Sequence, residues 1–248
     1  TVNNLTAKTF GDSGASQNFG VVTWTGDGSS SSAIKLGFQP DLLWIKRRDT
    51  SYDHYLWDSI RGITKEIHTN LNYAEGTATN KLASFDSDGF TLKNQDGVNG
   101  NGFTYVAWAW KAGGTASSNT DGTITSSVSA NPSYGFSCLT YTGNSTAGST
   151  IGHGLSTAPD LIIVRNRSRA TNWAVGHSGN NGFANGNQLR LNTDGAVASS
   201  EEWFNDTSPT SSVFTVKNNY EVNYSGDNYV AYCWSEVSGF SKFSSYSG

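Results

Sequence analysis

Apolar and polar residues alternate with a period of two along most of the chain, a pattern that predicts β-strands rather than helices. Residues 105–110 and 229–234 are apolar on both faces of this alternation. Such strands are expected in the middle of a sheet, with one face on a sandwich core and the other covered by a loop, another layer or a neighbouring subunit. Turn signals, for example at 86–89 and 224–227, separate short strands at about the 8–12-residue spacing of antiparallel sandwiches.

The second half of the chain repeats three sequence blocks of the first half in the same order. Residues 19–26 recur at 136–143, residues 36–46 at 155–165, and residues 105–110 at 229–234. The spacing between matching blocks drifts by only a few residues, as loop insertions between fixed strands would produce. We therefore predict an all-β chain made of two tandem antiparallel β-sandwich (jelly-roll-like) domains that arose by internal duplication.

The repeat divides the chain into five segments. They are an N-terminal extension (1–17), a first repeat (18–113), a linker (114–133), a second repeat (134–238) and the first strand of a partial third repeat (239–248). The linker is assigned because residues 114–123 are rich in Gly, Ser and Thr, which is typical of flexible connections. A short strand-like segment rich in Thr, Ser and Val follows them, before Asn131 and Pro132. The third repeat is assigned because residues 239–248 resemble residues 135–143, the start of the second repeat.

One isolated strand has no core of its own, so Phe240, Phe243 and Tyr246 need a surface to pack against. The preferred solution is pairing with the second repeat of the same chain, because the connecting loop is shortest there. Exchange between chains, which would make a homo-oligomer, is the second choice. The absence of Met predicts a processed protein or a piece of a longer one.

Composition and charge exclude several classes of partner. Only 15% of the 248 residues are charged and the net charge is −4, so the chain lacks the basic field that nucleic acids and anionic membranes require. No run is long and apolar enough for membrane insertion. The two cysteines, Cys138 and Cys233, lie within alternating strands and are predicted to be buried thiols.

The sequence shows no constellation typical of an enzyme or a metal site. The four histidines are not clustered, and phosphate-binding and nucleophile-elbow motifs are absent. Asp86 and Asp88 supply oxygen ligands, but their spacing favours a hairpin turn over a calcium loop. We therefore expect no catalytic residues, no bound metal and no cofactor, although a carboxylate pair across a cleft stays open as an alternative.

Aromatic residues mixed with polar ones are the more informative signal. A pyranose presents an apolar face to a ring and hydroxyls to Asn, Asp and His, so such mixtures indicate a glycan-binding surface. The candidate residues follow the second repeated block in each half: Tyr52, His54, Tyr55, Trp57 and Asp58 in the first, and Trp173 and His177 in the second. The alternative is that Tyr55 and Trp57 point inward as core. Trp110 and Trp234 are expected to be core or interface residues rather than ligand platforms.

Several segments of the first half resemble a known family. These segments are residues 37–46, 57–62, 84–92 and 105–113. Together they are similar to a domain of unassigned function that recurs in phage tail and virion proteins, notably of marine and cyanobacterial phages. The second half departs from this pattern, with Gly176 and His177 where the first half has Trp57 and Asp58.

The resemblance implies a virion or extracellular location, tandem arrays and contacts with other virion proteins. Together with the aromatic and polar segments, it favours a non-catalytic structural or adhesion module of a phage tail fibre or tail. Such a module would bind a host cell-surface polysaccharide or glycan, or would simply extend the fibre. The alternative from a different class is a secreted carbohydrate-active enzyme, a glycoside hydrolase or lyase with a β-sandwich cleft.

Overall fold

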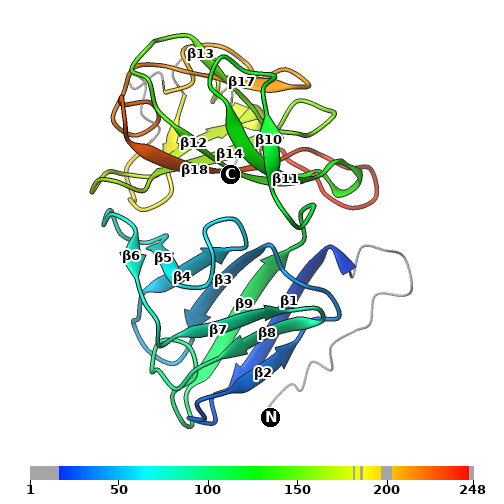
Figure 1. The fold of residues 1–248 in the computed structure, drawn as a ribbon, viewed down its shortest axis with the longest axis vertical. Coiled ribbons are helices and arrows are strands. Elements are labelled where there is room, and N and C mark those ends of the chain that lie inside the picture. The colour runs from blue at the N-terminus through cyan, green and yellow to red at the C-terminus, as the bar shows by residue number, and fades with distance from the viewer. Residues whose placement is uncertain (1–16, 181, 185–186, 197–202, 246–248) are drawn as a thin grey trace.

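The computed structural model describes residues 17–180, 182–184, 187–196 and 203–245, and these form two units of antiparallel β-sheet (Figure 1). The all-β prediction is confirmed, because the helical elements assigned there are short 3-10 turns, among them η2 (Pro132–Tyr134) and η3 (Ser178–Asn180). Residues 1–16 of the predicted N-terminal extension, and Tyr246 near the C-terminus, lie outside the described residues.

The first unit contains a six-stranded and a three-stranded sheet. The larger has the order β1 (Phe19–Thr25), β9 (Thr104–Trp110), β3 (Leu42–Arg47), β4 (His54–Asp58), β5 (Lys65–His68) and β6 (Gly76–Thr77). The smaller has the order β2 (Ser32–Lys35), β8 (Gly89–Leu92) and β7 (Leu82–Asp86). Asp86 pairs with Gly89 across the β7–β8 turn, which confirms the predicted hairpin at this position.

The second unit contains a seven-stranded and a two-stranded sheet. The larger has the order β10 (Ser117–Asn119), β11 (Ser126–Asn131), β12 (Phe136–Thr142), β18 (Asn228–Trp234), β14 (Leu161–Asn166), β15 (Ala174–His177) and β16 (Leu189–Arg190). The smaller pairs β13 (Ser149–Gly152) with β17 (Val213–Val216). The prediction of a flexible connection at 114–123 is wrong, because β10 lies in it and pairs with β11. The strand-like segment predicted after it is present as β11, which pairs with β12 from Phe136 to Tyr141.

The two large sheets share strand order and register. In the first, the order β1-β9-β3-β4 matches β12-β18-β14-β15 in the second. Leu42 pairs with Trp110 at the end of β9, and Leu161 pairs with Trp234 at the end of β18. The sequence repeat thus corresponds to a repeat of strand pairing, while its origin by duplication stays a prediction.

An aspartate before β3 and its counterpart before β14 show why the repeated Pro-Asp block has the same fold in both units. Asp41 accepts a hydrogen bond from the Ser59 hydroxyl at 2.7 Å, and Asp160 accepts one from Ser178 at 2.8 Å. The second carboxylate oxygen of each accepts the backbone N–H two residues beyond its unit's last strand. Each aspartate therefore joins the start of one strand to the ends of two others.

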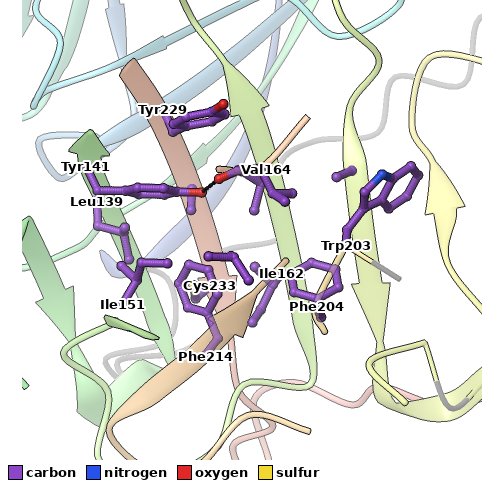
Figure 2. Packing of buried hydrophobic residues seen from close by; sticks show 14 of the residues in the cluster. Leu139, Tyr141, Ile151, Ile162, Val164, Trp203, Phe204, Phe214, Tyr229 and Cys233 are labelled. Atoms are coloured by element: carbon purple, nitrogen blue, oxygen red, sulfur yellow. Dashed lines mark hydrogen bonds between the residues drawn. The ribbon is translucent and has the colours of Figure 1, made fainter. Parts of the chain in front are cut away.

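Three apolar clusters hold the layers together. The first lies between the two sheets of the first unit and the second between the two sheets of the second unit, where Leu139, Ile162 and Cys233 converge with Phe214 (Figure 2). The third lies between the two large sheets and contains buried residues from both units. This third cluster explains why β9 and β18 are apolar on both faces: one face of each strand packs on the core of its own unit, and the other faces the opposite unit.

The two cysteines fall in different clusters. Cys138 belongs to the cluster between the units and Cys233 to the core of the second unit. Both are buried and free, as predicted, and burial raises the pKa of each thiol. They are inert packing residues rather than nucleophiles.

The C-terminal segment folds back on the second unit, but not as a strand. Gly239 adopts φ 77°, and the only β-type pairing after β18 among the described residues is one bridge between Val237 and Ser241. The left-handed backbone of Gly239 reverses the chain a few residues after the end of β18, so this segment cannot extend alongside another strand. The prediction of a strand at 239–248 is therefore wrong for the described part, residues 239–245.

Candidate functional site: a cleft between the two units

Equivalent strand ends bring two aromatic pairs together where the units meet. Phe19 contacts Trp110 with ring centroids 5.0 Å apart, and Phe136 contacts Trp234 at 5.1 Å. Trp110 and Trp234 contact each other edge to face at 5.8 Å. Both tryptophans are half-buried and pack against the cluster between the units, which confirms that they are interface residues. That they are not ligand platforms stays a prediction.

These rings line one compartment of a cleft, which we call the aromatic compartment. It has a volume of about 390 Å³ and is lined by Asn18, Phe19, Trp44, Trp110, Tyr134, Phe136, Leu161, Ile163, Trp234, Phe240, Ser241, Lys242 and Phe243. The C-terminal segment contributes part of this lining, since Phe240 packs on Tyr134 and Phe243 packs on His177. The positive charge of Lys242 is paired with Glu236 at 2.8 Å.

A second hollow, the polar compartment, shares Trp44 with the first. It has a volume of about 450 Å³ and is lined by Trp44, His54, Thr69, Asn70, Leu191, Asn192, Thr193 and Asp194. The two compartments together form the inter-unit cleft. Its lining therefore changes from aromatic rings to amide, imidazole, hydroxyl and carboxylate groups on passing Trp44.

Hydrogen bonds fix the orientation of both amides in the polar compartment. The Asn70 amide oxygen accepts the His54 backbone N–H at 3.0 Å, and its nitrogen donates to Asp53 at 3.0 Å. Asn192 accepts the backbone N–H of Trp173 at 2.9 Å. Side chains held in this way lose little further entropy when they bind a ligand.

His54 is held neutral with a defined tautomer. Its Nδ1 accepts a hydrogen bond from the Trp44 indole N–H at 3.2 Å. Burial lowers the pKa of His54, and the nearby Lys46 ammonium lowers it further. At pH 7 the imidazole therefore carries its proton on Nε2, so the side chain offers one N–H donor next to the half-buried Trp44.

A buried ionic network ties the two units together next to the cleft. The Arg61 guanidinium contacts Asp58 at 2.5 Å and Glu75 at 3.0 Å, and Glu75 also binds Arg167 of the second unit at 2.8 Å. The Tyr232 hydroxyl, also from the second unit, donates to Asp58 at 2.7 Å. The Asp58 and Glu75 carboxylates raise the pKa of Arg61 despite its burial. The network therefore fixes how the cleft walls stand relative to each other.

Four of the seven residues predicted to face a glycan are core residues instead. They are Tyr55, Trp57, Asp58 and Trp173. Tyr55 and Trp57 stack on each other inside the first unit, as the alternative interpretation of simple alternation held. Trp173 lies in the cluster between the units and donates its indole N–H to the His68 carbonyl at 3.0 Å. The expectation that these four side chains face solvent is corrected.

The other three predicted residues are half-buried. His54 lines the polar compartment, and His177 lies behind Phe243 of the aromatic compartment. Tyr52 packs on the edge of the first unit's core, with the Arg47 guanidinium over its ring. The structure thus brings His54 into the cleft and leaves Tyr52 outside it.

Sequence reasoning missed most of the cleft residues. Trp44 lies in a repeated block whose alternation predicts a strand but no ligand contact. Asn70 and Asn192 lie in loops outside the repeated blocks. The feature that could have located the cleft is the apolar character of both faces of β9 and β18. Such strands need a second layer to cover them, and here that layer is the large sheet of the other unit.

Within the described ranges no cluster of three or more His, Cys, Asp or Glu side chains could hold a metal ion. Within the same ranges no helix has the length and apolar character needed to cross a membrane.

The fold and cleft define an all-β protein of two sandwich-like units with an aromatic and polar seam between them. The chain belongs to the family described as a domain of unknown function (DUF7483), whose match spans residues 14–248 and so includes both units. No curated protein and no solved structure matches the chain.

Proposed function

We propose that the protein is a non-catalytic glycan-binding adhesion module and that the inter-unit cleft is its binding site. The observation that carries this proposal is the change of lining at Trp44, where an aromatic wall meets two amides and an imidazole that hydrogen bonds hold in place. Cleft volumes of a few hundred Å³ are in the range of sites for small ligands.

The chemistry of a pyranose fits this arrangement. Its C–H face would stack on Trp44, whose indole N–H is already bonded to His54 and therefore needs no partner from the ligand. Its hydroxyls would bind Asn70, Asn192 and the Nε2–H of His54. All three protein groups are uncharged at pH 7, so the cleft suits sugar hydroxyls better than it suits a strongly anionic ligand.

The virion context is also a proposal, and the residues that resemble a phage tail and virion domain support it. In this setting the module belongs to a tail fibre or another tail-associated protein, outside the cell, among other virion proteins. Its ligand is a polysaccharide or glycan of the host cell surface. Repeated copies of the chain in a homo-oligomer would add avidity to a weak single site.

The test is a glycan array of bacterial surface polysaccharides and their oligosaccharides, followed by calorimetric titration of the best ligand. Replacing Trp44 by Ala should weaken binding roughly thirtyfold, because aromatic residues central to a site contribute about 2 kcal/mol or more. The matched control is Tyr73→Ala, which removes an exposed ring that does not line the cleft.

Three outcomes contradict the proposal. They are absence of binding anywhere on the array, equal affinity of the Trp44→Ala and Tyr73→Ala variants, and shortening of the bound glycan on incubation. The last outcome would instead favour a carbohydrate-active enzyme. A thermal melt of each variant shows whether lost binding reflects lost folding.

A further inference from the structure

The turn that precedes the last strand of each unit has the same backbone in both. Asn99 donates its backbone N–H to the Gln95 carbonyl at 2.7 Å, and Asn223 does the same to Asn219 at 2.8 Å. A tyrosine hydroxyl from the following strand closes each turn. In the first unit Tyr105 accepts the Gly100 N–H at 2.8 Å, and in the second unit Tyr229 accepts the equivalent N–H at 2.7 Å.

The second unit carries two aromatic rings on this turn that the first unit lacks. Tyr220 stands where the first unit has Asp96, and Tyr224 stands where it has Gly100. The first unit forms the same turn with neither ring. The turn therefore does not need Tyr220 or Tyr224 to fold, and their presence has to be explained in another way.

The two rings form a fixed surface feature, which we call the tyrosine platform. Tyr220 and Tyr224 stack with centroids 4.6 Å apart at an angle of 24°, and Tyr220 is 52% exposed. The Arg169 guanidinium lies 4.6 Å from the Tyr224 ring and 5.7 Å from the Tyr220 ring. It is anchored there by Asp227 at 2.6 Å. An exposed ring held by two neighbours in this way is preorganised for contact with a flat ligand.

We propose that the tyrosine platform is a second glycan site and that it takes a neutral pyranose. The apolar face of the sugar stacks on the exposed Tyr220 ring. Arg169 uses Nε for Asp227, and its side chain is 47% exposed, so its terminal nitrogens are available to donate to sugar hydroxyls. The nearby carboxylate of Asp227 balances the guanidinium charge, which favours a neutral ligand over an acidic one.

The platform is separate from the inter-unit cleft. Tyr224 lies in the turn before β18, which begins at Asn228. Trp234, which lines the cleft, is the last residue of that strand. A seven-residue strand spans about 20 Å at roughly 3.3 Å per residue. One chain would thus contact a long glycan, or two neighbouring glycans, at two points, which raises the overall affinity without a new contact.

The experiment measures binding at the platform in a Trp44→Ala background, in which the contribution of the cleft is strongly reduced. The probes are maltohexaose, cellohexaose and chitohexaose, and the readout is saturation-transfer NMR with titration of the sugar signals. At least one probe should bind. Adding Tyr220→Ala should weaken its binding about tenfold, Tyr220→Phe should restore it, and Tyr73→Ala should leave it unchanged. The phenylalanine variant separates ring stacking from any effect on folding.

The proposal is overturned if Trp44→Ala protein transfers no saturation to any probe, or if Tyr220→Ala binds as tightly as Tyr73→Ala. These outcomes differ from the outcome that contradicts the cleft proposal. In that case Trp44→Ala would bind the best glycan of the array as tightly as the wild-type protein does. Each site can therefore fail by itself.

Discussion

Replacement of Asp58 by Asn tests whether the buried network holds the two units as one body. The Asp58 side chain has no solvent exposure and accepts three hydrogen bonds, from the Arg61 backbone, the Arg61 guanidinium and the Tyr232 hydroxyl. The asparagine keeps the shape but removes the charge that compensates Arg61. Removing one partner of a buried ion pair costs about 3–5 kcal/mol, because the remaining charge stays desolvated.

We expect the lower part of that range for Asp58→Asn, about 3 kcal/mol, because Glu75 lies 3.0 Å from the Arg61 guanidinium and remains as a partner. The assay is equilibrium unfolding in urea, followed by far-UV circular dichroism and by tryptophan fluorescence. Because Tyr232 and Glu75 join the network from both sides of the seam, the wild-type protein should unfold in one transition by both probes.

A double-mutant cycle with Arg61→Met isolates the pair from other effects. If the Asp58–Arg61 ion pair accounts for the loss, the double variant should lose less stability than the sum of the losses of the two single variants. In the double variant neither side chain leaves an uncompensated buried charge. A loss below about 1 kcal/mol for Asp58→Asn, or strict additivity in the cycle, would refute this account of the seam.

Two other predictions follow from single side-chain contacts. His153 is buried, accepts the Leu155 N–H at Nδ1 and donates from Nε2 to the Thr210 carbonyl, and burial lowers its pKa. Below about pH 6.5, the ordinary pKa of histidine, the folded protein therefore binds fewer protons than the unfolded chain. The free energy of unfolding should be highest above that pH and should decrease as the pH falls below it. His153→Gln should reduce this pH dependence, as measured by urea unfolding at several pH values. A Cβ on Gly26 would lie 2.2 Å from the Gly100 carbonyl oxygen, so Gly26→Ala should cost about 1–3 kcal/mol; an unchanged melting temperature would contradict that contact.

The sequence by itself determined the strands of the repeated blocks, the equivalence of the two halves and the burial of both thiols. A period of two is a property of the extended chain, so residues 105–110 and 229–234 could be placed on sheets without knowing their neighbours. The repeated blocks indicated that both halves use the same strands, and the structure has the same register in both. These inferences succeeded because they depend on local geometry.

The limits of sequence reasoning were at positions where a polar strand resembles a loop. Residues 117–119 are Ser, Ser and Asn, which is also the composition of a linker. They form a strand because β11 offers them backbone partners, and β11 pairs in turn with β12; both pairings are known only from the tertiary structure. The same holds for Trp57, whose burial depends on the three-stranded sheet that covers it.

The cleft was decided by the tertiary structure alone. Trp44, His54, Asn70 and Asn192 are scattered along the chain and meet only because the outer faces of the two large sheets pack together. The sequence shows that those faces are apolar, and so that something must cover them. It does not show what covers them, because the hydrophobic effect has no direction and is satisfied equally by a loop, a partner subunit or, as here, the second half of the same chain.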